Sequence, residues 1–303
     1  MNIIRHCLPV LAAIITTCND QDTIVDAAWA LSYLSDGDND RIQEVVNLNL
    51  VPAFENMLKS GIQQLIIPAL RTLGNIVSGD EEQTQTVVDV NVFPSLVMLL
   101  SHHKKNVRKE TCWMLSNIAA GSYSQLDSLV MTPLLIDNVL IQMSSTTEWD
   151  VRKEATWVIC NVATGGSSKH IRSLVEKNAM KHICDLLDVG DVRILLVAME
   201  ALEAILKFGS YLQEAEKKFF YMVDDFGGID KLEQLQEHEN TEIYNKAIKL
   251  LETYFGGAEE DSENLMPATN DHGNFSFGIT QNRANKLYTP ELGTHDLQFE
   301  FSF

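Results

Sequence analysis

Basic residues are scarce in this chain, and the side-chain groupings that mark most enzymes and metal sites are missing. Only 23 lysines and arginines stand against 42 aspartates and glutamates, which gives the 303 residues a formal net charge of −19. Such a charge repels nucleic acid and anionic membranes and attracts basic partners, unless the acidity serves solubility alone. We therefore expect a basic partner, and neither a nucleic acid nor a membrane.

Cysteines are also few, and none is spaced for a metal or a disulfide. The five cysteines stand at positions 7, 18, 112, 160 and 184 and form no CxxC motif. Three of them lie in apolar helical runs, which predicts buried free thiols in a reducing compartment. His102-His103 and His182-Ile183-Cys184 lack a second ligand pair at zinc-finger spacing, so we expect no metal and no cofactor. Apolar runs fall short of the ~20 residues that span a bilayer. Met1 leads into a helical pattern without the features of a signal peptide.

Enzyme motifs are absent as well. The chain contains no GxxxxGKS/T, GxGxxG, HExxH or GxSxG pattern, and the stretch from Gly165 to Lys169 lacks Walker spacing. Glu110 and Glu154 each stand three residues before a tryptophan, a pattern typical of a binding ridge rather than of a paired acid and base. We expect a protein that is not an enzyme.

The chain does contain a long-range repeat. A tryptophan followed four residues later by tyrosine or asparagine occurs at Trp29/Tyr33, Trp113/Asn117 and Trp157/Asn161, with Arg71/Asn75 at the intervening phase. The steps are about 42, 42 and 44 residues, within the range of roughly 40–47 of HEAT and armadillo repeats. This period predicts an all-α superhelical solenoid in which each unit buries its apolar face on its neighbours.

The spacing of the repeated residues predicts a binding surface. Positions i and i+4 share one face of a helix, so each indole and its carboxamide project together. The helix interior is left to Leu31, Leu34, Leu73, Ile76, Leu115, Ile118, Ile159 and Val162. An amide both donates to and accepts from a peptide backbone, and indoles form slots for cationic stems. The alternative, a core tryptophan with a helix-ending asparagine, is less favoured, because the motif keeps its phase beside glycines 37, 79, 121 and 165. We expect these glycines to be left-handed caps.

Each unit is predicted to hold a short first helix, an amphipathic second helix and the helix with the repeated motif. In the third unit these are Thr84–Val90, Phe93–Leu100 and Asn106–Ala119. Prolines 9, 52 and 94 suit the first turn of second helices. In the fourth unit, Thr132-Pro133 is expected to open the second helix and Trp149-Asp150 to precede the third.

The motif is lost in the fifth unit, where Glu200 and Ala204 stand at the tryptophan and asparagine positions. A sixth unit ends near residue 255 and has the charged surface of a terminal cap. Residues 1–255 thus hold about six repeats, the first without its first helix, as expected of a fragment or a short isoform. Residues 256–303 are an acidic, Phe- and Gly-rich tail that we predict to be disordered.

The repeated segments resemble successive repeats of one protein family, in the same order along the chain. The stretch from Asp26 to Gly37 looks like the fifth armadillo repeat of importin-alpha, the adaptor for nuclear localisation signals, and that from Pro68 to Asp80 resembles the sixth. The segments from Arg108 to Ile118 and from Arg152 to Asn161 resemble the seventh and eighth. The resemblance covers residues 1–255 and includes Arg71, which stands at the tryptophan position of the sixth repeat. It implies a nuclear import adaptor of the cytoplasm and nucleus.

The resemblance implies a site for basic peptides, of which the minor-site half is present here. The matching residues are Trp29, Tyr33, Arg71, Asn75, Val77, Thr84, Glu110, Trp113, Ser116, Asn117, Glu154, Trp157 and Asn161. In the family, the asparagines hold the peptide backbone, the tryptophans flank lysine or arginine stems, and the glutamates meet the cations. Arg71 is expected to repel a basic side chain.

Partners follow from the same resemblance. Basic localisation peptides of cargo proteins are the expected ligands, and the export receptor that recycles the family is expected at the last repeat and acidic tail. Recruitment of importin-beta is not expected, because residues 1–30 hold a single basic residue, Arg5, in place of the family's basic segment. The alternative function is a regulatory or scaffold armadillo protein that binds partners without carrying cargo.

Overall fold

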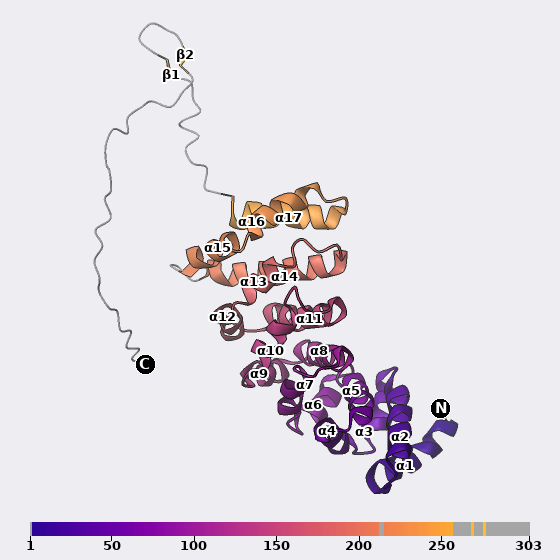
Figure 1. The fold of residues 1–303 in the computed structure, drawn as a ribbon. Coiled ribbons are helices and arrows are strands. Elements are labelled where there is room, and N and C mark those ends of the chain that lie inside the picture. Colours follow the sequence, from indigo (N-terminus) through magenta and orange to yellow (C-terminus); the bar gives the residue numbers. More distant parts are fainter. Residues whose placement is uncertain (1, 212–214, 257–267, 270–274, 277–303) are drawn as a thin grey trace, which may run out of the picture. The chain divides into compact units, whose positions relative to one another are not determined.

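The computed structural model describes residues 2–211 and 215–256, together with two dipeptide strands (Figure 1). Contacts divide the chain into two compact units, Met1–Phe255 and Gly256–Phe303. In the second unit, β1 (Ala268–Thr269) pairs antiparallel with β2 (Phe275–Ser276). The disorder predicted for the rest of this tail lies outside the described residues.

Within Met1–Phe255 the helices follow the predicted repeat units, each with up to three helices. The first helices of the units are α3 (Asn39–Val46), α6 (Glu81–Val88), α9 (Tyr123–Met131), α12 (Ser168–Glu176) and α15 (Ala215–Asp225). The second helices are α1 (Asn2–Thr17), α4 (Val51–Lys59), α7 (Phe93–Leu99), α10 (Leu135–Gln142), α13 (Ala179–Cys184) and α16 (Gly228–Gln234), which continues into a 3-10 turn, η1 (Leu235–Glu237). The third helices are α2 (Gln21–Ser35), α5 (Gln63–Ile76), α8 (Lys105–Ala119), α11 (Trp149–Gly165), α14 (Val192–Ser210) and α17 (Thr241–Tyr254).

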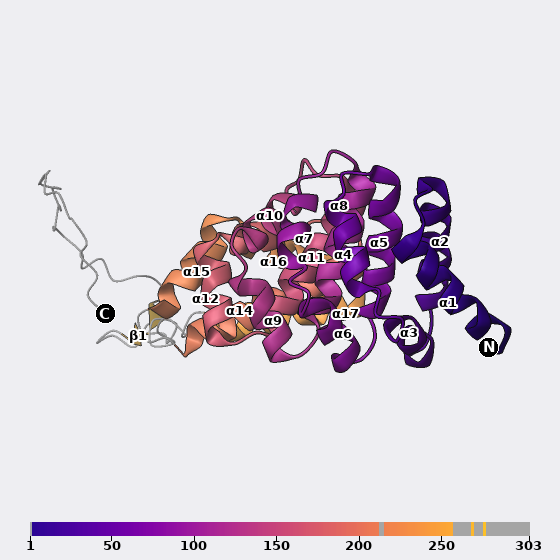
Figure 2. The same cartoon turned by 90° about the horizontal axis from the view of Figure 1, so that it is seen from below.

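The third helices form a continuous stack. They pack on one another in chain order, α2 on α5, α5 on α8, α8 on α11, α11 on α14 and α14 on α17. Figure 1 shows α11, α14 and α17 one above another, and Figure 2 shows α2 beside α5 at the amino-terminal end. The predicted helical-repeat solenoid is therefore confirmed for the described part of residues 1–255.

The core lies between the packed helices, and the third helices contribute to it the residues that the period predicts. Leu31, Leu73, Leu115 and Ile159 have no exposed surface, and Leu34 is half-buried. Burial of each such side chain contributes about 1.5–3 kcal/mol relative to exposure. The third helices thereby hold their polar faces at a regular spacing.

Some helix boundaries differ from the prediction. Pro52 and Pro94 stand in the first turns of α4 and α7 as predicted, but Pro9 lies inside α1. Trp149 is the first residue of α11 rather than a residue before it. The second helix of the fourth unit begins at Leu135, after Thr132-Pro133, because Leu134 has a left-handed backbone that cannot continue a helix.

The prediction that glycines 37, 79, 121 and 165 are left-handed caps is wrong. Among described glycines, positive φ occurs at Gly61 and Gly227, and residue 165 lies within α11. At Gly79 and Gly121 the requirement is space, since a Cβ there would collide with the side-chain amides of Gln83 and Gln125. Each of these glutamines accepts a backbone N–H that opens the next helix, at 3.1 and 3.0 Å.

Left-handed residues instead join the first and second helices of the units. Asn49, Asn91, Leu134 and Asn178 have φ between 55° and 63°. Asparagine tolerates this backbone because its short polar side chain bonds locally, whereas leucine does not. Leu134 is therefore the strained member of a recurring turn.

Candidate functional site

The tryptophan and asparagine positions share one face of the third-helix stack. Trp29, Trp113 and Trp157 are half-buried, so part of each indole faces solvent. Tyr33 is 67% exposed and stacks on Trp29, with ring centres 6.0 Å apart and an angle of 27° between the planes. The surface thus has an aromatic pair at its amino-terminal end and two tryptophans further along the chain.

Trp113 lies in a slot made by the preceding repeat. A Cβ at Gly74 would come within 2.8 Å of the indole Cε3, so only glycine lets this ring approach helix α5 so closely. The guanidinium carbon of Arg71 lies 5.6 Å from the centre of the ring, within reach of a cation–π interaction. One face of Trp113 is therefore occupied by the protein's own arginine.

Glu110 is already paired in this structure. Its Oε1 lies 2.7 Å from Nη2 of Arg71, and its side chain is buried whereas that of Arg71 is half-exposed. A charge-assisted bond to a buried carboxylate holds the arginine firmly. The two residues expected to attract and to repel a peptide cation thus neutralise each other.

Trp157 has an arginine on its ring as well, from the following repeat. The guanidinium carbon of Arg193, at the start of α14, lies 5.0 Å from the ring centre. Sequence reasoning missed this residue, because it stands outside the repeated motif. Among the described residues, no ion pair to a carboxylate holds Arg193, unlike the Arg71–Glu110 pair.

Glu154 is the acidic group nearest to this second tryptophan in sequence. Burial raises the pKa of Glu154 above its ordinary value of 4.5, and the carboxylate of Glu110 adds to the rise against the opposing charge of Lys109. A half-buried carboxylate without a tight partner gains from a cation brought by a ligand. Glu154 is thus better placed than Glu110 to meet a bound cation.

The asparagines join the repeats to one another. Nδ2 of Asn161 donates to the backbone oxygen of Ser116 at 2.9 Å, and Nδ2 of Asn117 lies 3.5 Å from that of Gly74. Each amide has a second N–H and an oxygen, and both residues are half-buried. Asn117 and Asn161 therefore keep hydrogen-bonding capacity toward a ligand.

Asn75 differs from these two. Its Nδ2 donates to the Ser32 carbonyl at 2.8 Å and contacts Oγ of Ser35 at 3.0 Å, and the residue is only 6% exposed. Both amide hydrogens are used inside the protein. The structure therefore places Asn75 in the packing between repeats, and leaves its carbonyl oxygen as the remaining polar group.

Three further residues of the predicted site are buried. Thr84 donates to the Val77 carbonyl at 3.3 Å, and Ser116 donates to the Trp113 carbonyl at 2.8 Å. Hydroxyl groups bonded to their own backbone shape the surface instead of reaching outward. Val77, Thr84 and Ser116 thus belong to the packed interior rather than to the exposed surface.

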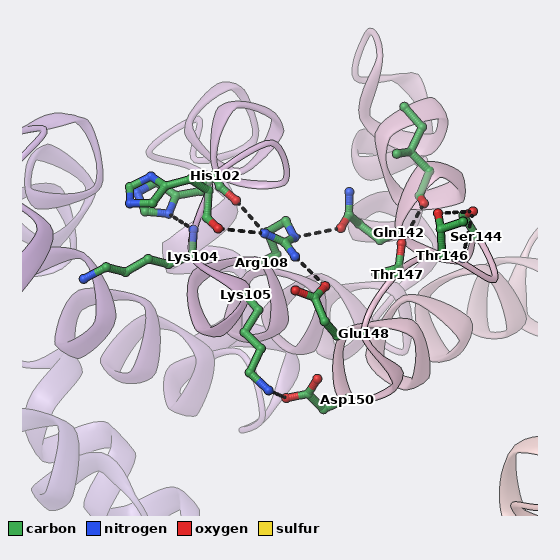
Figure 3. Close-up of polar contacts among 12 residues, drawn as sticks. His102, Lys104, Lys105, Arg108, Gln142, Ser144, Thr146, Thr147, Glu148 and Asp150 are labelled. Atoms are coloured by element: carbon green, nitrogen blue, oxygen red, sulfur yellow. Dashed lines mark hydrogen bonds and ion pairs between the residues drawn. The ribbon is translucent and has the colours of Figure 1, made fainter.

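A polar network joins the segments that contain the two tryptophan helices. Arg108 of α8 donates to Gln142 at 3.1 Å and pairs with Glu148, which precedes α11, at 2.6 Å (Figure 3). Lys105 pairs with Asp150 of α11 at 3.2 Å. Arg108 and Glu148 are 40 residues apart, close to the repeat period, and sequence reasoning did not use this signal.

The described residues offer little for metal or membrane chemistry. No group of three or more His, Cys, Asp or Glu side chains is placed to hold a metal ion in these ranges. In the part of the chain that the structure describes, no helix is long and apolar enough to cross a membrane. The Cys112, Cys160 and Cys184 thiols are buried as predicted, and burial raises the pKa of Cys184 to about 12.

The helical repeats, with their recurring tryptophan and asparagine positions, define the class of protein to which this chain belongs. Residues 1–36, 38–78 and 80–120 match the armadillo/beta-catenin-like repeat, and residues 217–268 match the atypical Arm repeat. Among solved structures, a designed armadillo repeat protein in complex with the peptide (KR)4 superposes with a TM-score of 0.71 at 27% identity, covering 82% of this chain and 99% of that one. The chain is an armadillo-repeat protein.

Curated relatives narrow the class. The chain is 41% identical to importin subunit alpha-4 of Arabidopsis thaliana over 291 residues, which are 93% of this chain and 53% of the relative. It is 42% identical to importin subunit alpha-1b of Oryza sativa subsp. japonica, covering 90% and 52%. The chain belongs to the importin-alpha family. It spans about half the length of the curated relatives it matches, as expected for their carboxy-terminal part.

Proposed function

We propose that this chain is the peptide-binding part of a nuclear import adaptor and holds basic localisation peptides along its third-helix face. The observation that carries the proposal is the pair of half-buried tryptophans on α8 and α11, each followed by an asparagine with unused hydrogen-bonding capacity. The likeness to a designed armadillo protein bound to alternating lysine and arginine supports this ligand class. Shuttling between cytoplasm and nucleus would follow from this role.

The chemistry of such binding is extended-peptide recognition. Asn117 and Asn161 use their unused amide atoms to hold the peptide backbone, which fixes its path without reading its sequence. A lysine or arginine stem lies between the indoles of Trp113 and Trp157, and Glu154 meets its charge. Arg71 keeps its pairing with Glu110, so the repeat that contains Arg71 binds no lysine or arginine of the peptide.

Calorimetric titration with a short Lys/Arg peptide tests the proposal. Trp113→Ala combined with Trp157→Ala should cost roughly 2–4 kcal/mol, a weakening of about 30- to 1,000-fold, because aromatic hot spots act on that scale. Trp149→Ala is the matched control, since this exposed tryptophan begins α11 but stands outside the rows. Unchanged affinity in the double variant would show that the peptide binds elsewhere.

Salt dependence separates the proposal from the scaffold alternative. Affinity should fall as salt rises to physiological strength, where the Debye length shortens to about 8 Å. The reason is that charge attraction between the net −19 chain and a cationic peptide is screened. An affinity independent of salt would favour an apolar interface and a scaffold function.

A further inference from the structure

A cavity of about 670 Å³ lies one repeat beyond Trp157. One side is formed by the end of α11 and the start of α12, including Ala163 and Ile171, and the other by α14, including Glu200, Ala204 and Phe208. It therefore continues the third-helix face into the fifth unit, where the tryptophan and asparagine signature is lost.

The loss of the signature explains the hollow. Ala204 stands at the asparagine position, and its methyl group cannot donate to the preceding repeat as Asn161 does to Ser116. The equivalent acceptor, the Cys160 carbonyl, takes the hydroxyl of Thr164 at 2.8 Å within its own helix. Without a bulky indole or a bridging amide, the space between α11 and α14 stays open.

The lining of the cavity suits an aromatic side chain. Ala163, Ile171 and Phe208 are buried apolar residues, and Tyr211 forms a wall with 73% of its surface exposed. Aromatic rings gain about 0.5–1.5 kcal/mol from favourable mutual geometry beyond the area they bury. The buried hydroxyl of Ser167, another lining residue, stands in the capping box that opens α12, and it donates to none of the described residues.

The charges on the rim favour a neutral occupant. Glu200 and Lys207 both line the cavity, so a carboxylate and an ammonium group oppose each other there. Glu203 is already neutralised by Lys246 at 3.3 Å and Lys249 at 2.7 Å. A lysine or arginine would gain little net attraction, whereas tryptophan or tyrosine offers an apolar body and one polar atom for Ser167.

We propose that this cavity receives a tryptophan or tyrosine side chain of the same peptide that the two tryptophans hold; the inference rests on the proposed function. Packed helices lie 8–10 Å apart, and an extended peptide advances about 3.3 Å per residue. The aromatic residue should therefore stand about three residues from the one held at Trp157, on one flank of the basic stretch.

Fluorescence titration with paired peptides tests the inference. Each pair shares one Lys/Arg stretch and differs by tryptophan or alanine placed one to six residues away on either flank. We expect the tryptophan peptide to bind about tenfold tighter, on one flank only and at a spacing near three. Ala204→Leu, which places a larger side chain in the cavity, and Tyr211→Ala, which removes its wall, should abolish this ratio. Tyr221→Ala, 63% exposed and outside the lining, should preserve it.

The outcomes separate the two proposals. If the alanine peptide binds through Trp113 and Trp157 and tryptophan adds nothing at any position, the cavity inference is overturned alone. The same holds if the tryptophan advantage survives Ala204→Leu. If neither peptide binds, the proposed function fails and the cavity inference falls with it.

Discussion

Replacing Arg193 by alanine should tighten the binding of a basic peptide. In the structure its guanidinium lies 5.0 Å from the centre of the Trp157 ring, where a peptide cation would have to sit. An exposed cation–π contact is worth about 0.5–1 kcal/mol, and the incoming peptide must displace it. Removing this internal competitor should therefore improve affinity about two- to fivefold.

Calorimetric titration at physiological salt measures the effect, and Arg172→Ala is the control. Arg172 is an exposed residue of α12, so its removal changes the net charge by the same amount without uncovering an indole. The gain from Arg193→Ala should exceed that of the control and should disappear in a Trp157→Ala background, because coupled residues are not additive. Weaker binding by the Arg193→Ala protein would refute the reasoning, since it would make this arginine a contributor to peptide binding.

Three further predictions concern stability and pH. Leu134→Asn should stabilise by about 1 kcal/mol and raise Tm by about 2–4 °C, because its left-handed backbone strains a leucine that is 64% exposed; Met131→Asn, in a regular helix, should bring no such gain in thermal melts. Peptide affinity should rise with pH through the raised pKa of Glu154, because the bound cation favours the carboxylate, and Glu154→Gln should flatten a calorimetric pH series. The hydrogen bond to His170 holds the pKa of Asp127 below its ordinary value of 3.8, so Asp127→Asn should lower the stability of the protein at neutral pH. This loss of stability should shrink as acid protonates Asp127 in the parent protein. A loss that stays the same in acid denaturation would contradict the prediction.

Much of the fold was predictable because the same sequence pattern recurs in successive repeats. The period of about 42 residues and the apolar spacing within each third helix predict the stack, and Leu73 and Leu115 are buried as that spacing requires. Boundaries were less predictable, since turn geometry is a local matter. The left-handed backbone of Leu134 shifted the start of α10, and the amide of Gln83, not a left-handed cap, explains Gly79.

The sequence by itself determined which residues share the third-helix face, because an interval of four along a helix and about 42 along the chain leaves little freedom. Only the tertiary structure decided what each of them touches. Asn75 donates both amide hydrogens to groups inside the protein, whereas Asn161 donates one. The ring of Trp157 contacts an arginine of the next repeat. These contacts join residues roughly 40 positions apart, and their distances depend on how closely two helices pack. That packing is set by many side chains at once, and no periodicity records it.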